Sequence, residues 1–365
     1  MKRAIGFGGF AGRRRGRRVK RKGGRLNRLW TGRPALGRTP AAGPGLEALE
    51  PRLLLSALVV DTLNDVVAAD GSVSLREAIE AANANAVVNE ADASGSAGPD
   101  EITFDAGLFP GTITLGSSLP TITEALTITG PGADQLTIDA DGNGRLFNLD
   151  DGTAASITVM IEEMTLSGGD AAGDGGAVLN RETTTLFRVE IADNAASGEG
   201  GGIYNAGTLL VRDSAVIANT ASGGDGGAVA NAEDATLDLF NSTLSGNTAS
   251  GSGGGVANAS PNPGTISIAN STITDNRAED DATGDGGGVF TDAGDTLWMQ
   301  STIVADNFLG GGASEDDVAG GFDPAGGFNL IGIADGATGL TTPASQNLLG
   351  DEADPLDPAL EPLND

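Results

Sequence analysis

Four acidic residues occupy one position of a repeated glycine cluster, where their carboxylates could bind a metal ion. They are Asp174, Glu199, Asp225 and Asp285, and a fifth cluster carries Ser252 instead. If the repeats stack, these carboxylates form a column on one edge, and Ca²⁺ takes about six to eight oxygen ligands. Stacked carboxylates also repel one another, and no strict Asp-bearing nonapeptide repeat is present. A calcium edge and a row of solvated turns are therefore both open.

The residue types that most catalytic sites need are missing. The chain has no His and no Cys, which removes Ser-His-Asp and Cys-His catalysis, thiol redox chemistry and disulfides, and argues against zinc. A polygalacturonase-like site also needs a His, and a pectate-lyase-like site needs Ca²⁺ with a basic residue. Arg188 and Arg212 are the only basic residues in neighbouring regular repeats, and Arg212 precedes Asp213. A surface ion pair explains Arg212 as well as catalysis does, so no catalytic residue is assigned.

Nine asparagines recur with the repeat and form two sets. The first set closes a twelve-residue segment of each repeat and comprises Asn194, Asn219, Asn247, Asn276 and Asn307. The second set follows the glycine clusters and comprises Asn180, Asn205, Asn231 and Asn258. In stacked coils such residues lie one above another, where their amides can hydrogen-bond along the stack and tolerate the left-handed backbone of tight turns. We predict a structural role for both sets.

These residues belong to five repeats between Gly173 and Asn307. The glycine clusters read GDGGAV, GEGGGI, GDGGAV, GSGGGV and GDGGGV, and their starts differ by 25, 26, 27 and 33 residues. The segments after them run from TTTLFRVEIADN to TLWMQSTIVADN and align without a gap. A period of this length is typical of a solenoid, because so short a unit cannot bury its own apolar face and must stack on its neighbours.

The apolar positions of the segments predict strands. The fourth and ninth positions are always apolar, and the second is apolar except at Thr184. Apolar residues two apart are strand spacing, and the odd interval before the ninth position indicates a corner, so that each unit reads strand, turn, strand, turn. Clustered glycines would cost roughly 1 kcal/mol each inside a helix. The predicted fold class is all-β, a right-handed parallel β-helix.

The charge of the chain changes sharply after residue 45. Residues 1–45 hold 14 of the 21 Lys and Arg and no acidic residue, which leaves 7 basic against 50 acidic residues, a net charge of −43, in the remainder. The basic arm has too few apolar residues for a core and is predicted to be disordered. It is interpreted as a targeting or processing segment rather than a nucleic-acid or anionic-surface binder, because neither aromatic residues nor a folded binding domain accompany the basic residues.

Residues 46–60 read LEALEPRLLLSALVV. Leu49, Glu50, Pro51 and Arg52, with the leucines after them, resemble the LEPR-x-LL motif of exported and surface proteins of planctomycete bacteria. The resemblance implies an exported protein, on the cell surface or extracellular. No apolar run approaches the roughly 18 residues of a transmembrane helix.

Residues 61–99 contain one predicted helix, near residues 75–85. Ser74 and Glu77 form a capping box, and the apolar residues after it fall on one helical face. Such a helix would cover the exposed apolar end of the first coil. The stretch from Ser74 to Ala78 resembles the CSLREA domain that precedes bacterial β-helices, with Val73 in place of the family's cysteine.

Residues 100–310 are assigned to the β-helix, in which 100–170 form less regular coils. Residues 311–365 are expected to be irregular and acidic, with one more strand in Gly327–Ile333, and the resemblance implies a truncated chain. The acidic pairs Asp280–Asp281 and Asp316–Asp317 lie in Gly- and Ala-rich stretches and are interpreted as solvated loops.

Two function classes remain open. The glycine clusters with NTASG joins resemble repeats of polymorphic outer membrane proteins, which implies a non-enzymatic surface or secreted β-helix, structural or adhesin-like, with envelope or extracellular polysaccharide or protein partners. The alternative is a polysaccharide-binding or lyase-like β-helix using Ca²⁺, the only cofactor considered. Carbohydrate clefts usually present aromatic platforms, whereas Trp298, Tyr204, Phe187 and Phe240 are few and scattered. Nucleic acid is not an expected partner.

Overall fold

A computed structural model describes residues 57–94, 98–258, 264–279, 286–292, 297–311, 314–341 and 345–360. All of them belong to one compact unit, Pro51–Asp365. The basic arm, most of the LEPR-like segment, Asp280, Asp281 and Asp285 lie outside the described residues.

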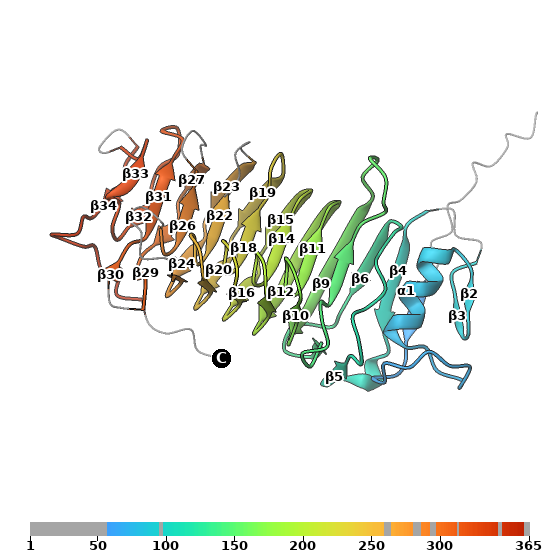
Figure 1. Cartoon of the computed structure of the whole chain (residues 1–365). Helices are drawn as coiled ribbons and strands as arrows, with labels where there is room; N and C mark the ends of the chain where they lie inside the picture. Colours follow the sequence, from blue (N-terminus) through green and yellow to red (C-terminus); the bar gives the residue numbers. More distant parts are fainter. Residues whose placement is uncertain are drawn as a thin grey trace, which may run out of the picture. The chain divides into compact units, whose positions relative to one another are not determined.

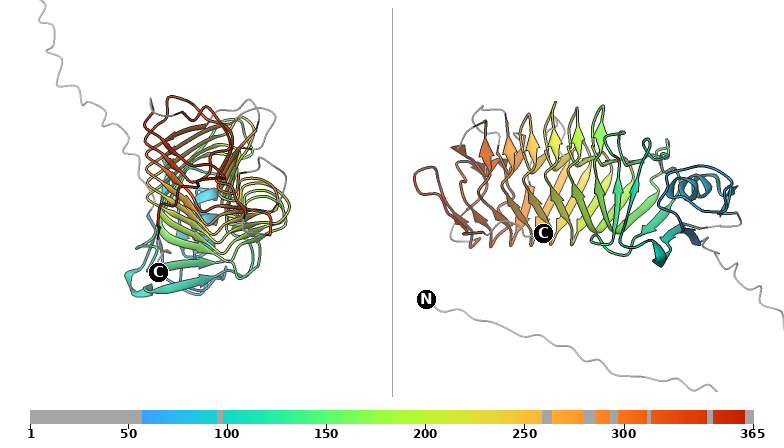
Figure 2. Two further views of the ribbon diagram at one scale, coloured as in Figure 1. Left: turned by 90° about the vertical axis from the view of Figure 1, so that its left-hand side faces the viewer. Right: turned by 90° about the horizontal axis from the view of Figure 1, so that it is seen from below.

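The compact unit is a stack of β-coils. Strands of successive coils lie side by side along the stack (Figure 1), and the view from below shows the same order (Figure 2, right). Nearly all pairings between coils are parallel, as in the pairing of Thr208–Arg212 with Thr236–Phe240. The predicted all-β parallel β-helix is confirmed.

The largest sheet has 17 strands within the described residues, and in the regular coils a corner between two successive strands bends it. Its strands are β1 (Ala57–Val60), β4 (Asp100–Phe104), β5 (Gly111–Thr114), β6 (Leu126–Thr129), β7 (Leu136–Asp139), β9 (Thr158–Ser167), β12 (Thr183–Ala192), β15 (Thr208–Arg212), β16 (Ala215–Ile217), β19 (Thr236–Phe240), β20 (Thr243–Ser245), β23 (Thr265–Ala269), β24 (Thr272–Thr274), β27 (Leu297–Gln300), β28 (Ile303–Val304), β32 (Leu330–Ile331) and β34 (Leu348–Leu349).

Two further sheets complete the coils. Among the described residues, an eight-stranded sheet contains β8 (Phe147–Leu149), β11 (Val178–Asn180), β14 (Ile203–Asn205), β18 (Val229–Asn231), β22 (Val256–Asn258), β26 (Val289–Thr291), β31 (Val318–Gly321) and β33 (Gly336–Thr338). A seven-stranded sheet in the same part of the chain contains β10 (Asp170–Ala171), β13 (Ala195–Ala196), β17 (Thr220–Ala221), β21 (Thr248–Ala249), β25 (Arg277–Ala278), β29 (Phe308–Leu309) and β30 (Ser314–Glu315).

Each regular coil has more strands than the sequence predicted. One coil runs through β18, β19, β20 and β21 before the next glycine cluster. The predicted strand-turn-strand-turn unit covers β19 and β20 and misses the other two. Strands of two or three residues are too short to display an alternating pattern, so the sequence alone did not reveal them.

The interior of the stack is apolar, as the periodicity predicted. The fourth-position residues Leu186, Val211, Leu239, Ile268 and Met299 and the ninth-position residues Ile191, Val216, Leu244, Ile273 and Val304 are all buried. The exception at the second position, Thr184, is also buried, and its hydroxyl donates a hydrogen bond to Oδ1 of Asn180 at 2.7 Å. The predicted corner is present at the sixth position, where Asp213 and Asn241 have φ values of 52° and 50°.

The predicted helix is present as α1 (Leu75–Ala84). Ser74 and Glu77 form the capping box, in which each backbone N–H donates to the other's side chain, at 3.0 and 3.2 Å. Leu75 and Ile79 are buried in the apolar core, so the helix covers the end of the first coils (Figure 1). A short hairpin of β2 (Val87–Val88) and β3 (Ala91–Asp92) packs beside it, and a 3-10 turn, η1 (Ala106–Leu108), follows β4.

The stacked coils extend beyond residues 100–310. β1 pairs in parallel with β4, so Ala57–Val60 of the LEPR-like segment already belongs to the sheet. After residue 310, β31 pairs with β26, and β32, the strand expected in Gly327–Ile333, pairs with β28. Within the described residues, no helix is long and apolar enough to cross a membrane.

Candidate functional site

The first asparagine set forms a ladder in the buried interior. Nδ2 of every member except the last donates to Oδ1 of the asparagine in the next coil, at 2.8 to 2.9 Å. The members are Asn194, Asn219, Asn247, Asn276 and Asn307, all at most 1% exposed. Nδ2 of Asn247 also donates to the backbone carbonyls of Val216 and Ser245. The amides therefore satisfy buried backbone groups as well as each other, which is a structural role.

The second asparagine set forms another ladder, in which each asparagine is the last residue of a strand of the eight-stranded sheet. Nδ2 of Asn180, Asn205 and Asn231 donates to Oδ1 of the next member at 2.8, 2.7 and 3.1 Å, and the last member is Asn258. All four side chains are buried. Together the two ladders fix the register of the regular coils, because each amide has one matching partner above and one below.

Asp317 ends the first ladder, and the solvated-loop interpretation of this residue is wrong. Its side chain is 1% exposed. Oδ1 accepts hydrogen bonds from N and Nδ2 of Asn307 at 2.9 and 2.8 Å, and Oδ2 accepts from the backbone N of Ile333 at 2.7 Å. Burial raises the pKa of Asp317 to about 7, against the lowering effect of these hydrogen bonds. The polar surroundings of Asp317 in sequence concealed its position at the end of the buried ladder.

The acidic residues of the glycine clusters follow one another along the stack. Oδ1 of Asp174 accepts from the backbone N of Glu199 at 3.0 Å, and Oδ1 of Asp225 accepts from the backbone N of Ser252 at 2.7 Å. Burial, followed by the charges of Asp225 and Asp174, raises the pKa of Glu199. Asp174 and Asp225 therefore hydrogen-bond to the turn of the next coil. A calcium ion at this edge would need the same carboxylate oxygens as ligands. Asp285 lies outside the described residues.

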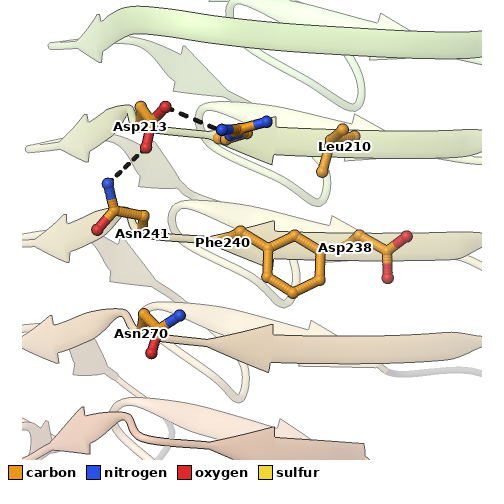
Figure 3. A pocket seen from close by; sticks show the side chains of 7 residues that line it. Leu210, Asp213, Asp238, Phe240, Asn241 and Asn270 are labelled. Carbon is orange, nitrogen blue, oxygen red and sulfur yellow. Dashed lines mark hydrogen bonds and ion pairs between the residues drawn. The ribbon is translucent and has the colours of Figure 1, made fainter.

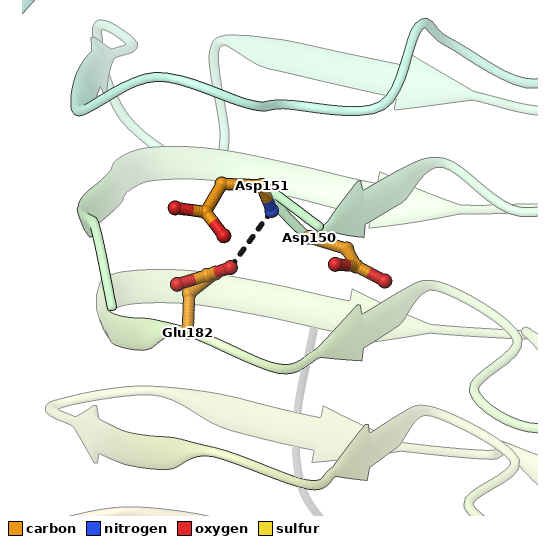
Figure 4. Close-up of side chains that lie close together, drawn as sticks. All are labelled: Asp150, Asp151 and Glu182. Carbon is orange, nitrogen blue, oxygen red and sulfur yellow. Dashed lines mark hydrogen bonds between the residues drawn. The ribbon is translucent and has the colours of Figure 1, made fainter. Parts of the chain in front are cut away.

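Three other carboxylates come close together, although no pattern in the sequence indicates it. Asp150, Asp151 and Glu182 have ligand oxygens within 4.8 Å of one another (Figure 4). The two oxygens of Glu182 accept hydrogen bonds from the backbone N atoms of Asp151 and Ile157 at 2.8 and 2.9 Å. Asp150 forms an ion pair with Arg181 at 3.3 Å. These partners give the cluster a structural role in holding the loop after β8.

The two arginines that were considered for a lyase-like site, and not assigned to one, lie on a different face from the acidic column. Arg188 and Arg212 project from the 17-stranded sheet, whereas the column lies in the turns that precede the eight-stranded sheet. Arg188 pairs with Glu163 at 2.9 Å and Arg212 with Asp213 at 3.3 Å. The structure therefore does not bring Arg212 and the acidic column into one catalytic site.

A groove runs along the bend of the 17-stranded sheet, where the corner residues adopt left-handed backbone. We call it the corner groove. One part has a volume of about 580 Å³ and is lined by Leu210, Arg212, Asp213, Asp238, Phe240, Asn241 and Asn270 (Figure 3). A second part, of about 920 Å³, shares Asp213 and Asn241 and extends the groove past Arg188 and Glu163. Nδ2 of Asn241 donates to Oδ1 of Asp213, which links two coils across the groove floor.

Three aromatic residues that are scattered in sequence lie on the same outer face. Phe187 and Phe240 flank Arg212 in register, and Trp298 stands in register with Ser267 and, one coil earlier, Asp238. The guanidinium carbons of Arg188 and Arg212 lie 4.7 and 5.6 Å from the centroid of the Phe187 ring, which is cation–π geometry. Tyr204 belongs to the eight-stranded sheet and does not share this face.

The sequence matches no model of a known protein family, and comparison with curated proteins finds no significant similarity.

Proposed function

We propose that this chain is a non-enzymatic protein of the cell surface or the extracellular space, with a structural or adhesin-like role. The observation that carries the proposal is the continuous ladder of buried side chains from Asn194 to Asn307. Because each amide bonds to its neighbours above and below, the coils form a stiff stack. The outward side chains then keep constant positions, which suits a structural or adhesive surface.

The location outside the cell is supported by the resemblance of residues 46–60 to an export-associated motif. The net charge of −43 after residue 45 is compatible with it, because strong like charge keeps exposed molecules soluble and apart.

A calcium-dependent lyase is less well supported. Its two parts, Arg212 and the acidic column, lie on different faces of the coil. Arg212 is paired with Asp213, and Asp174 and Asp225 hold backbone N–H groups of the next coil. A substrate bound through calcium at that column would not reach the Arg212 guanidinium.

Two measurements test the proposal. The purified chain, incubated with pectate or alginate and Ca²⁺, should give no rise in the absorbance of unsaturated products. Products that appear with the wild type and vanish with Arg212→Ala would establish a lyase instead. In cells that carry the gene, the chain should occur in the medium or be cleaved by protease added to intact cells. Protection until the cells are lysed would contradict the surface location.

A further inference from the structure

The corner groove combines an aromatic surface with planar polar groups, and this chemistry indicates which class of ligand it binds. Phe240 lines the groove, and Trp298 lies outside its lining, on the same outer face two coils further on. Both residues are half-buried, so part of each ring faces outward. Arg212, with a side chain 59% exposed, offers several N–H donors, while Asp238 and Asn270 offer carboxylate and amide groups. Ring faces carry partial negative charge and attract C–H groups, and paired donors and acceptors suit hydroxyl groups. A sugar presents both kinds of surface.

The charge of the groove excludes a strongly anionic ligand. Arg188 and Arg212 face five carboxylates along the two parts of the groove, which leaves a net charge of −3. The five are Asp134, Glu163, Glu190, Asp213 and Asp238. Arg188 and Arg212 also form ion pairs with Glu163 and Asp213, which weakens the attraction of their guanidinium groups for an anionic ligand. A polyuronate or sulfated chain would be repelled, whereas a neutral chain would not.

The spacing of the aromatic residues fits an extended chain along the axis. Phe240 lies in β19 and Trp298 in β27, two coils later through β23. Successive strands are about 4.8 Å apart, and Trp298 is in register with Asp238, two residues before Phe240. The two positions therefore differ by about 10 Å along the axis and by about 7 Å across it. We propose that the corner groove, with the outer face that continues it to Trp298, binds a neutral polysaccharide that runs along the stack, with Phe240 and Trp298 as stacking platforms.

In this arrangement the remaining groove residues position the polar groups. Phe187 holds the Arg212 guanidinium through the cation–π contact, and Asn241 holds Asp213 by a hydrogen bond. Arg212, in register with Phe240 on the preceding coil, and Asp238, two residues before Phe240 in β19, would then contact sugar hydroxyls beside this ring. This inference rests on the adhesin-like function proposed above, for which it names the class of ligand.

The test is affinity electrophoresis of the purified chain in gels that contain soluble glucan, mannan, xylan or galactan, with pectate and alginate as anionic comparisons. We expect at least one neutral polysaccharide to retard the chain and the anionic ones not to. Phe240→Ala, Trp298→Ala and Arg212→Gln should each weaken that retardation about tenfold or more. The thermal midpoint of Arg212→Gln should equal that of the wild type, which separates lost binding from lost folding.

Matched control variants lie on the other face. Arg181→Gln changes an arginine with a side chain 50% exposed that pairs with a neighbouring carboxylate at 3.3 Å, as Arg212 does. Tyr204→Ala removes an aromatic ring from the eight-stranded sheet. Both should bind like the wild type. Absence of neutral-polysaccharide binding, preference for the anionic chains, or equal losses in groove and control variants would overturn the inference. Lyase products or an intracellular location would instead overturn the proposed function and leave this binding result standing.

Discussion

Replacing Asn247 by Ala is the sharpest test of the asparagine ladder. Oδ1 of Asn247 accepts hydrogen bonds from both N and Nδ2 of Asn219, at 3.0 and 2.9 Å, and its Nδ2 donates to Asn276 at 2.8 Å. The side chain is fully buried, so water does not replace it readily. The variant leaves the backbone N–H of Asn219 without its acceptor in the interior, whereas Nδ2 of Asn219 keeps the carbonyls of Ile191 and Ile217.

The expected loss follows from the stranded Asn219 N–H and from the amide that is removed. A buried polar group without a partner costs about 1–3 kcal/mol, and the hydrogen bonds from Nδ2 of Asn247 to Val216 and Asn276 are worth about 1 kcal/mol each, so Asn247→Ala should lower the free energy of unfolding by about 3–5 kcal/mol. With a urea dependence of about 3 kcal/mol per M, the unfolding midpoint falls by on the order of 1 M. Asn270→Ala is the matched control, because Asn270 is an exposed asparagine at a corner with φ 52°. Loss of its left-handed preference costs about 1 kcal/mol.

The assay is urea unfolding followed by far-ultraviolet circular dichroism, together with hydrogen exchange read by mass spectrometry. Stacked repeats unfold locally as well as globally, so peptides that cover β16, β20 and β24 should exchange faster in Asn247→Ala than in the control. Equal midpoints and equal exchange in the two variants would show that the ladder does not stabilise the stack.

Three further outcomes are expected. Gly227→Ala should lower the thermal midpoint strongly, because its Cβ would lie 2.3 Å from the Gly254 carbonyl oxygen and overpacking costs about 1–3 kcal/mol or more, whereas Gly173→Ala, with no heavy atom within 4 Å, should not. The folded-state pKa of Asp317 is raised to about 7. Its contribution to stability is therefore complete below its unfolded pKa and is lost as pH rises through about 7. The urea midpoint of the wild type should fall between about pH 5 and pH 8, and the midpoint of Asp317→Asn should fall less. Chelation of calcium should leave the thermal midpoint unchanged, since Asp174 and Asp225 already bond to the next coil; a fall would indicate a bound ion.

The repeat made the interior of the coils predictable and left the short strands hidden. The fourth and ninth positions report burial directly, because every coil must fill the same narrow core. The strands beside the glycine clusters, such as β18 and β21, span two or three residues and carry no period of their own. The burial of Asp317 was not predictable for a related reason. Asp317 takes the place of a ladder asparagine in a stretch where the repeat is no longer regular.

The outer face could not be read from residue types, because the repeat does not restrict outward side chains. The sequence therefore showed Phe187, Phe240 and Trp298 as scattered residues, although they share one face. The carboxylates Asp150 and Glu182 were missed because Asp150 lies in the less regular coils before the first repeat, and only the register of β8 with β11 places them together.

The spacing of the ladder asparagines nevertheless indicates which outward side chains lie next to one another on successive coils. Asn194, Asn219 and Asn247 are separated by 25 and 28 residues, and the same intervals lead from Phe187 to Arg212 and to Phe240. The later intervals of 28, 29 and 31 residues lead from Leu210 through Asp238 and Ser267 to Trp298. Because a parallel register moves every residue of a segment by the same number, each buried asparagine sets the axial neighbour of every outward residue in its segment. Insertions between segments change the interval for the whole coil and leave the stacking of the outer face intact.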